Sequence, residues 1–330
     1  MTMYNEAFLD RLYAMLKAAL PSWSLSPDTE LSLLTISENA TYRVYDRAAD
    51  RRLILRVHRP NYHSTQEIVS ELAWISALRE SGVASTPAPI AGRDGAFLYR
   101  LHDGIDERDV AAFEYVEGRE PVPDHDLAGW FDRLGAISAR LHLHARSWQR
   151  PPGFTRKIWN FDTMIGASPH WGPWSAGLGL DAAGRALLGR AVDAIQKHVE
   201  RFGMGPERFG LVHADLRLAN LLVNGDKLHL IDFDDCGFSW FAYDFASSVS
   251  FIEHDPIIPA LLDAWISGYR TVLPLPEEDA AMIPIFVMLR RIMLVAWIAS
   301  HSETPTAQEL GVPYTLDSLI LADRFLTQYA

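Results

Sequence analysis

The sequence predicts an α+β protein of two lobes, a small lobe rich in antiparallel strands and a larger lobe built mainly of helices. Three observations support this. In the first third, short runs of β-branched and aromatic residues alternate with turn residues. From residue 124 onward, apolar residues recur at helical spacing. One loop and hairpin, residues 211–233, interrupts the helical part.

The first lobe begins with an expected amphipathic surface helix over residues 1–20, whose charged positions also argue against a signal peptide. A helix over 64–79 is predicted next, because Ser64 is a capping residue and Ile68, Leu72 and Ile75 follow at helical spacing. The predicted strands are 31–36, 41–45, 53–58, 96–101 and 110–116. One helix therefore interrupts the sheet.

The second lobe contains a predicted hairpin of two short strands, 221–223 and 228–231, joined by the turn dipeptide Asn224-Gly225. The predicted helices are 127–143, 182–199, 257–268, 280–299 and 316–325. This order of elements is typical of a two-lobe protein-kinase-like fold. We divide it into an N-terminal lobe (1–112) for nucleotide binding, a hinge (113–118) and a helical C-terminal lobe (119–330) for catalysis and acceptor binding.

Composition narrows the class of protein. The chain has 330 residues, 48% of them hydrophobic, and a formal net charge of −12. That charge argues against a nucleic-acid partner, since phosphate binding needs clustered cations. Cys236 is the only cysteine, so the chain forms no internal disulfide, and a cytoplasmic location is expected. The sequence does not indicate an oligomeric state.

The most hydrophobic stretch, residues 281–300, has two charged residues at its centre, Arg290 and Arg291. Charges are costly in the middle of a bilayer. We therefore expect a buried helix with one solvated edge, and no membrane partner.

The strongest functional signal is the segment HADLRLAN, residues 213–220, followed after the hairpin by IDF, residues 231–233. Phosphoryl transfer needs a carboxylate near the attacking hydroxyl and oxygen ligands for Mg²⁺. Asp215 can take the first role, and Asn220 and Asp232 can bind the metal ion. The alternative is that all three are ordinary turn residues. The ordered set, with a hairpin between its parts, favours the functional interpretation.

This segment resembles the catalytic loop and metal-binding segment of the aminoglycoside phosphotransferase superfamily, which includes choline kinases, type II homoserine kinases and bacterial stress-response kinases. The resemblance implies ATP and Mg²⁺ as cofactors and places His213 and Arg217 with Asp215 in the catalytic loop. The chain departs from the family pattern in having Ala214 where glycine is usual, a minor change if the backbone there is ordinary. Arg217 adds a charge beside the expected base.

In the first lobe, the resemblance assigns nucleotide contacts to a glycine-free turn and to the following strand. Asn39 lies in this turn, which resembles the E-N-x-x-Y turn of the stress-response branch; a plain hairpin turn is the alternative. Arg56 stands where the family has a phosphate-binding lysine, and a solvated strand position is its alternative. Family register makes Glu71 the partner of Arg56, whereas Glu67 fits a solvated position. The turn also contains Ser37 and Glu38.

Residues 113–116 resemble the hinge whose backbone binds adenine, so the nucleotide contacts extend to Glu114, Tyr115 and Val116.

On the acceptor side, two carboxylates follow the expected metal ligand. Asp234 and Asp235 can support the ion or face a cationic acceptor, and Asp244 is expected to bond the backbone near His213. Trp240 belongs to a group of aromatic residues that can contact an amine, although aromatic residues more often form core. The loop 168–174 is expected to cover the acceptor.

We therefore expect an ATP-dependent kinase that phosphorylates the hydroxyl group of a small, amine-bearing molecule. A Ser/Thr protein kinase of the stress-response type is one alternative, suggested by Asn39 and the Arg59-Pro60 pair. A nucleotide-binding pseudokinase is another, suggested by Arg56 and the glycine-free turn. The sequence leaves the acceptor open.

Overall fold

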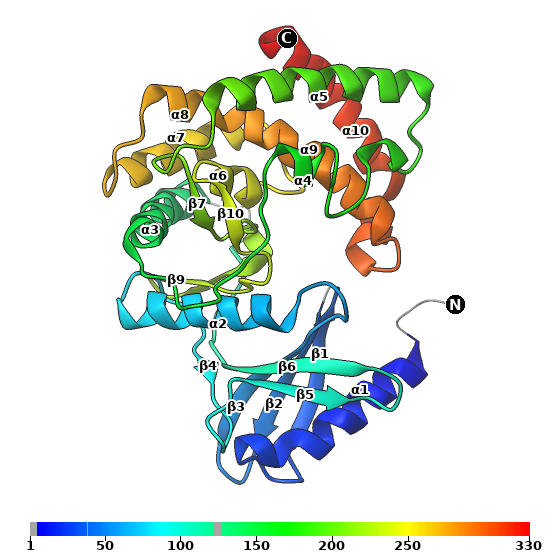
Figure 1. The fold of residues 1–330 in the computed structure, drawn as a ribbon, viewed down its shortest axis with the longest axis vertical. Coiled ribbons are helices and arrows are strands. Elements are labelled where there is room, and N and C mark those ends of the chain that lie inside the picture. The colour runs from blue at the N-terminus through cyan, green and yellow to red at the C-terminus, as the bar shows by residue number, and fades with distance from the viewer. Residues whose placement is uncertain (1–4, 38, 122–126) are drawn as a thin grey trace. The chain divides into compact units, whose positions relative to one another are not determined.

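The computed structural model describes residues 5–37, 39–121 and 127–330. The chain forms two compact units, one of residues 1–117 and 150–155 and the other of residues 118–149 and 156–330 (Figure 1). The first break lies within the segment predicted as a hinge. The return of residues 150–155 to the first unit is a tertiary feature, fixed in part by a hydrogen bond of 3.0 Å from the Thr155 amide to Ser70.

The first unit contains a six-stranded antiparallel sheet in the order β1-β2-β3-β6-β4, with β5 paired to β6. The strands are β1 (Glu30–Ile36), β2 (Ala40–Asp46), β3 (Arg51–Val57), β4 (Pro89–Ile90), β5 (Leu98–His102) and β6 (Glu107–Glu114). The five predicted strands are confirmed to within a few residues. β4 was missed because two residues give no periodic signal.

Helix α1 (Glu6–Ala19) covers one face of this sheet. The Asn5 side chain caps it by accepting a hydrogen bond of 2.9 Å from the Phe8 amide. Its apolar stripe, which includes Phe8, Leu12 and Leu16, packs with the short helical turn η1 (Leu20–Trp23) against the inward residues of the strands. Burial of each such side chain contributes about 1.5–3 kcal/mol. The predicted amphipathic helix is confirmed from residue 6 onward, and residues 1–4 of that prediction lie outside the described residues.

Alternation along β3 places Arg56 on the opposite face of the sheet. Leu55 and Val57 belong to the core under α1, and successive side chains of a strand point to opposite faces. Helix α2 (Thr65–Glu80) supplies the residue that Arg56 meets on that other face, Glu71. A capping box between Ser64 and Glu67 begins the helix, close to the predicted start.

The second unit is mainly helical, as predicted. Its helices are α3 (Leu127–Ser147), α4 (Phe161–Met164), α5 (Ala182–Phe202), α6 (Tyr243–Ser248), α7 (Ile258–Arg270), α8 (Glu277–Ala281), α9 (Ile283–Ser300) and α10 (Pro305–Tyr329), with a 3₁₀ turn η2 (Trp174–Ala176). Helix α10 begins well before the predicted residue 316. Gly311, at φ 44°, and Pro313 kink it and disrupt its periodicity.

The described residues contain one helical stretch, Glu277–Ser300, that is long and apolar enough to cross a membrane, and 83% of its apolar window is buried inside the protein. It is a core helix. The expected solvated edge at its centre is wrong, because Arg290 and Arg291 are only 3% and 1% exposed. Each guanidinium is instead neutralised by a carboxylate, Asp215 for the first and Glu253 for the second.

Two small antiparallel pairs of strands complete this unit. β8 (Leu221–Asn224) and β9 (Lys227–Leu230) form the predicted hairpin, with Gly225 in the left-handed conformation at φ 56°. β7 (Phe209–Val212) pairs with β10 (Gly237–Trp240) and was not predicted, because each strand has only four residues and their pairing is distant in sequence.

Candidate active site

The catalytic loop and the metal-binding segment meet because of strand pairing. Val212, just before the loop, pairs with Gly237. The hairpin closes the other side, where the Ile231 amide donates to the Asn220 carbonyl at 3.0 Å. Asp232 is the next residue along the chain. The loop 213–220 and the segment 231–236 therefore lie side by side. The order of the motifs predicted this arrangement, and the strand pairing explains it.

Helix α6 holds the backbone of the catalytic loop. Asp244 accepts hydrogen bonds from the amides of Ala214, at 2.8 Å, and His213, at 3.4 Å. Ser247, one turn later on the same face, accepts from the Leu216 amide at 3.0 Å. The predicted structural role of Asp244 is confirmed.

Ala214 adopts the left-handed conformation, with φ 67°. The replacement of the family glycine by Ala214 was expected to be minor only if the backbone there were ordinary. A left-handed backbone is not ordinary for alanine, so the replacement is not a minor one. An L-residue costs about 1 kcal/mol more than glycine in this region. The hydrogen bond to Asp244 compensates for part of this backbone strain.

The carboxylate of Asp215 is held by three donors. Its Oδ1 accepts from the Arg290 guanidinium at 2.6 Å. Its Oδ2 accepts from Asn220 Nδ2 at 2.7 Å and from Arg217 Nε at 3.2 Å. Burial alone would raise the pKa of Asp215, but the charges of Arg217 and Arg290 outweigh it and hold the pKa below its ordinary value. The carboxylate is thus fixed and ionised at neutral pH.

Arg290 is a site residue that sequence reasoning missed. It extends from α9 and also donates to the Tyr243 hydroxyl at 3.0 Å and to Ser250 Oγ at 3.1 Å. Burial raises the pKa of Tyr243 to about 12, against the opposing charge of Arg290. The position of Arg290 in the sequence could have identified it, because an arginine inside an apolar helix requires a buried carboxylate as its partner.

His213 and Arg217, both predicted catalytic, contact the Asp215 residue in different ways. The His213 ring is fully buried; its Nδ1 accepts from the Asp215 amide at 3.3 Å, and its Nε2 is 3.2 Å from the Ile231 carbonyl oxygen. It therefore braces the loop against the metal-binding segment. Arg217 is partly exposed and contacts the carboxylate itself.

Asn220 and Asp232, the predicted metal ligands, present oxygen atoms that suit a hard divalent cation. Asn220 Nδ2 donates to both the backbone and the side chain of Asp215, and its Oδ1 therefore points away from the base. Asp232 is exposed and adopts a left-handed backbone, φ 59°. Non-glycine residues in this conformation are uncommon and concentrate at functional sites. The donor set fits the ion that the sequence implied.

The three residues predicted to contact the acceptor are placed differently. Asp235 lies within electrostatic range of Arg290 and Tyr243, hence close to the base. The Asp234 backbone carbonyl accepts a hydrogen bond from Arg156. Trp240 is core: it stacks on Phe286, and its indole nitrogen donates to the Gly203 carbonyl at 2.8 Å.

Of the other aromatic residues near this segment, Trp159 and Trp171 are buried against each other, with ring centroids 5.3 Å apart. The Trp171 ring lies 5.4 Å from the Arg290 guanidinium. Its cation partner is therefore an arginine of this chain.

In the first unit, Arg56 and Glu71 form the predicted pair. One guanidinium nitrogen of Arg56 lies 2.7 Å from both carboxylate oxygens of Glu71, and both residues are buried. Arg56 also lies over the Phe113 ring, 4.8 Å from its centroid. The solvated alternative for Arg56 is thus wrong, whereas its contact with nucleotide stays a prediction.

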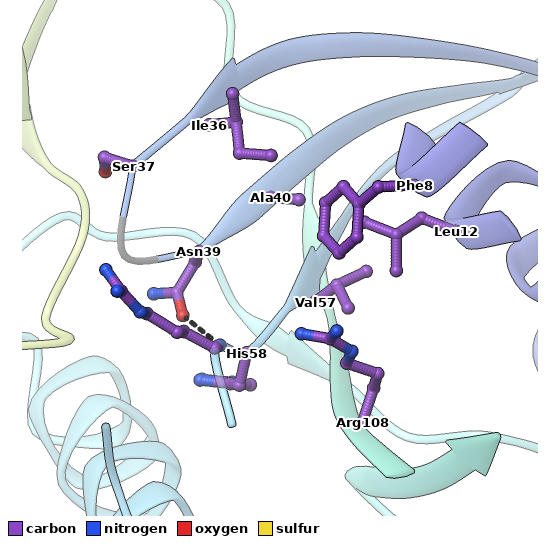
Figure 2. Close-up of a pocket in the computed structure, with 10 residues that line it drawn as sticks. Phe8, Leu12, Ile36, Ser37, Asn39, Ala40, Val57, His58 and Arg108 are labelled. Atoms are coloured by element: carbon purple, nitrogen blue, oxygen red, sulfur yellow. Dashed lines mark hydrogen bonds between the residues drawn. The ribbon is translucent and has the colours of Figure 1, made fainter. Parts of the chain in front are cut away.

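Figure 2 shows the turn between β1 and β2 beside a small pocket that Phe8 and Arg108 also line. The Ser37 amide donates to the Asn39 carbonyl at 3.1 Å. Asn39 Oδ1 accepts from the Arg59 amide at 3.3 Å, which ties the turn to the chain after β3. Glu38 lies outside the described residues.

The residues predicted to bind adenine end β6 and follow it. The Glu114 amide donates to the Ala88 carbonyl at 2.8 Å, and its carboxylate pairs with Arg79. In the part of the chain that the structure describes, the N–H groups of Tyr115 and Val116 have no hydrogen-bond partner. They are the available backbone donors of this segment.

Comparison with known proteins identifies relatives that match most of the chain. A family model described as a phosphotransferase enzyme family matches residues 32–278. Homoserine kinase of Methylobacillus flagellatus is 26% identical over 258 residues, 75% of this chain and 73% of the relative.

Two solved structures share the fold. A microcompartment-associated aminopropanol kinase is 42% identical, with a TM-score of 0.88, and the match covers 96% of this chain and 98% of that one. An amicoumacin kinase, solved in complex with AMP-PNP, Ca²⁺ and Ami, is 21% identical with a TM-score of 0.79, and the match covers 98% of this chain and 95% of that one. The protein-kinase-like fold predicted from the sequence is confirmed.

Proposed function

We propose that the chain transfers the γ-phosphoryl group of ATP to a short amino alcohol, with Mg²⁺ as the metal ion. The premise is that the chain belongs to the phosphotransferase enzyme family and phosphorylates hydroxyl groups of small molecules. The observation that carries the proposal is the Asp215 carboxylate, which is ionised and fixed by Arg290, Arg217 and Asn220. The 42% identity to an aminopropanol kinase supports the acceptor class.

Asp215 Oδ1 is the atom that we assign to the acceptor hydroxyl. A carboxylate oxygen has two lone pairs. Oδ2 already accepts from Asn220 and Arg217, whereas Oδ1 accepts from Arg290. The second lone pair of Oδ1 can therefore orient the hydroxyl and take its proton.

The lowered pKa of Asp215 makes it a weak base. Its main role is therefore to orient the acceptor hydroxyl, and it takes the proton only after the phosphoryl group has largely transferred. We assign the divalent cation to Asn220 Oδ1 and the Asp232 carboxylate. The ion neutralises charge on the phosphate oxygens when bound. Arg56, supported by Glu71, and the N–H groups of Tyr115 and Val116 are proposed to contact the nucleotide.

The ammonium group of the acceptor is assigned to Asp235. Asp215 alone is flanked by two arginines, which would repel an amine, and Asp235 supplies a further negative charge near Arg290. Asp234 would support the adjoining backbone, and we do not carry the core residue Trp240 into the acceptor site.

The test is ATP turnover with Mg²⁺ against 1-amino-2-propanol, ethanolamine, choline, homoserine and an aminoglycoside. We expect the highest kcat/KM with an amino alcohol, and no turnover with its deaminated counterpart. Turnover with no member of the panel, or equal turnover of the deaminated compound, would contradict the proposal. A peptide substrate in the same assay tests the protein-kinase alternative.

Asp235→Asn should raise KM for the amino alcohol and leave KM for ATP unchanged. Asp226→Asn, an exposed turn residue of the β8–β9 hairpin, is the matched control and should change neither constant. An equal effect on both substrates would remove Asp235 from the acceptor site.

A further inference from the structure

Asp244, the residue that bonds the catalytic-loop backbone, is itself held by a buried histidine. His142 Nε2 lies 3.0 Å from Asp244 Oδ2, and its Nδ1 lies 3.0 Å from the Tyr269 hydroxyl. All three side chains are buried. A continuous hydrogen-bonded chain therefore runs from α7 through α3 and α6 to the amides of Ala214 and His213.

Two glycines create this contact between α3 and α7. A Cβ atom on Gly135 of α3 would lie 2.0 Å from the Trp265 carbonyl oxygen, and one on Gly268 of α7 would lie 1.7 Å from the Asp132 carbonyl oxygen. The two helix backbones thus touch each other. His142 lies seven residues after Gly135 and faces the same side of α3. Tyr269 directly follows Gly268, so the crossing brings the two side chains together.

Chemistry allows one arrangement of protons in the chain. Burial lowers the pKa of His142, although Asp244 partly opposes this, and burial raises the pKa of Tyr269. The imidazole is therefore neutral and the phenol protonated. Asp244 already accepts from two amides, so it also accepts from Nε2–H of His142. Nδ1 must then accept from the Tyr269 hydroxyl, which fixes the tautomer.

We propose that His142 is a positioning residue for phosphoryl transfer: by donating to Asp244, with its tautomer set by Tyr269, it fixes the backbone that carries Asp215. The inference rests on the proposed function for its kinetic consequence. Ala214 is strained, and its hydrogen bond to Asp244 opposes relaxation of the loop. A loosened loop displaces the base, and a displacement of about 1 Å can cost a hundredfold in rate.

The kinetic test compares two substitutions of one residue. His142→Leu removes the donor to Asp244, whereas His142→Gln keeps an amide N–H in a similar place. We expect His142→Leu to lower kcat by about tenfold to a hundredfold with little change in KM for ATP, because nucleotide contacts are assigned elsewhere. His142→Gln should recover most of the lost rate, and all constants are expressed per folded protein measured by circular dichroism.

His144 provides the matched control. It lies on the same helix, is half-buried and stacks on Trp148, with ring centroids 5.7 Å apart, outside the chain to Asp244. His144→Leu should keep the kcat of the native protein. The proposal is overturned if His142→Leu retains full kcat, if His142→Gln is as slow as His142→Leu, or if KM for ATP accounts for the whole effect.

A second measurement needs no substrate. Nitrogen-15 NMR of the imidazole should show the neutral Nε2–H tautomer of His142 in the native protein, and a mixture of tautomers in Tyr269→Phe. An Nδ1–H tautomer or an imidazolium at neutral pH would overturn the proposed hydrogen-bond chain. If the native protein phosphorylates no amino alcohol yet shows this tautomer, the proposed function fails and the hydrogen-bond chain stands.

Discussion

Each of the two units contains a carboxylate paired with arginine, Glu71 fully buried in one and Asp215 partly buried in the other, and the two are held differently. Glu71 meets Arg56 in a contact between one strand and the next helix, 15 residues apart. Asp215 is held by Arg217 and Asn220 from its own loop and by Arg290 from α9, 75 residues away. The first pair is local, whereas the second cluster is assembled from separate parts of the chain.

This difference predicts what happens to each carboxylate when one of its partners is removed. Among the described residues, Glu71 pairs with the single cation Arg56, so loss of Arg56 leaves a buried charge without a partner there. Asp215 has three donors, so removal of one weakens its orientation and changes its pKa while leaving it satisfied. We therefore expect the Asp215 cluster to control kcat and the Arg56–Glu71 pair to control nucleotide binding.

Asp215→Asn should give the largest effect, a loss of about 10³-fold in kcat, because the amide cannot accept the proton of the hydroxyl. Glu71→Gln is the matched change in the other unit and should raise KM for ATP by roughly tenfold, the loss of one charge-assisted hydrogen bond. Steady-state kinetics with both substrates varied gives both numbers. Equal effects of the two changes on kcat would abolish the distinction between the two carboxylates.

Arg290→Gln should lower kcat and raise the pKa of Asp215, because one of the charges that hold this pKa down is removed. The acid limb of the kcat profile should consequently move to higher pH. Arg291→Gln is the control: it breaks the buried pair with Glu253 and should cost about 3 kcal/mol of unfolding free energy, whereas Arg290→Gln should cost less because Asp215 keeps Arg217 and Asn220. Only Arg290→Gln should move the acid limb; a shift in both variants would remove Arg290 from the site.

Arg56→Ala should weaken ATP binding by about tenfold or more, since the loss of a charged partner of a phosphate costs 1.5–3 kcal/mol, about the scale of one charge-assisted hydrogen bond. Arg43→Ala, an exposed arginine on the neighbouring strand β2, is the control and should leave binding unchanged. Calorimetric titration with a non-hydrolysable ATP analogue measures both. Unchanged affinity in Arg56→Ala would leave this pair a purely structural feature.

His142 links stability to pH. Its pKa is lowered in the folded state from 6.5, so the unfolded chain binds the proton more readily. The stabilising contribution is therefore complete above pH 6.5 and is lost as the pH falls through the folded-state pKa. The groups that face the ring are Asp244, Tyr269 and Arg146. Urea unfolding at several pH values should show this acid loss in the native protein and a weaker one in His142→Gln.

Ala214→Gly should stabilise the protein by about 1 kcal/mol, the smallest effect, because glycine adopts φ 67° without steric cost. Thermal unfolding should show a rise in Tm of about 2–4 °C for a unit of this size. Ala139→Gly, in the middle of α3, is the opposite control and should destabilise by a similar amount. A fall in Tm for Ala214→Gly would mean that entropy outweighs the backbone strain.

The sequence by itself determined the features that depend on neighbours along the chain. Periodicity gave the strands and most helices, and the Asn224-Gly225 turn gave the hairpin between the two halves of the catalytic segment. The strands, helices and hairpin are local features, so pattern and spacing contain them. The Arg56–Glu71 pair came instead from the family resemblance, whose register aligns one strand with the next helix.

Only the tertiary structure decided the features that join distant segments. The pairing of β7 with β10, the contact of Arg290 with Asp215 and the chain from Tyr269 to Asp244 each join residues far apart in sequence. Spacing does not encode such contacts. Arg290 shows the physical reason most clearly: the sequence states that a charge is buried in a helix, but packing decides which carboxylate neutralises it.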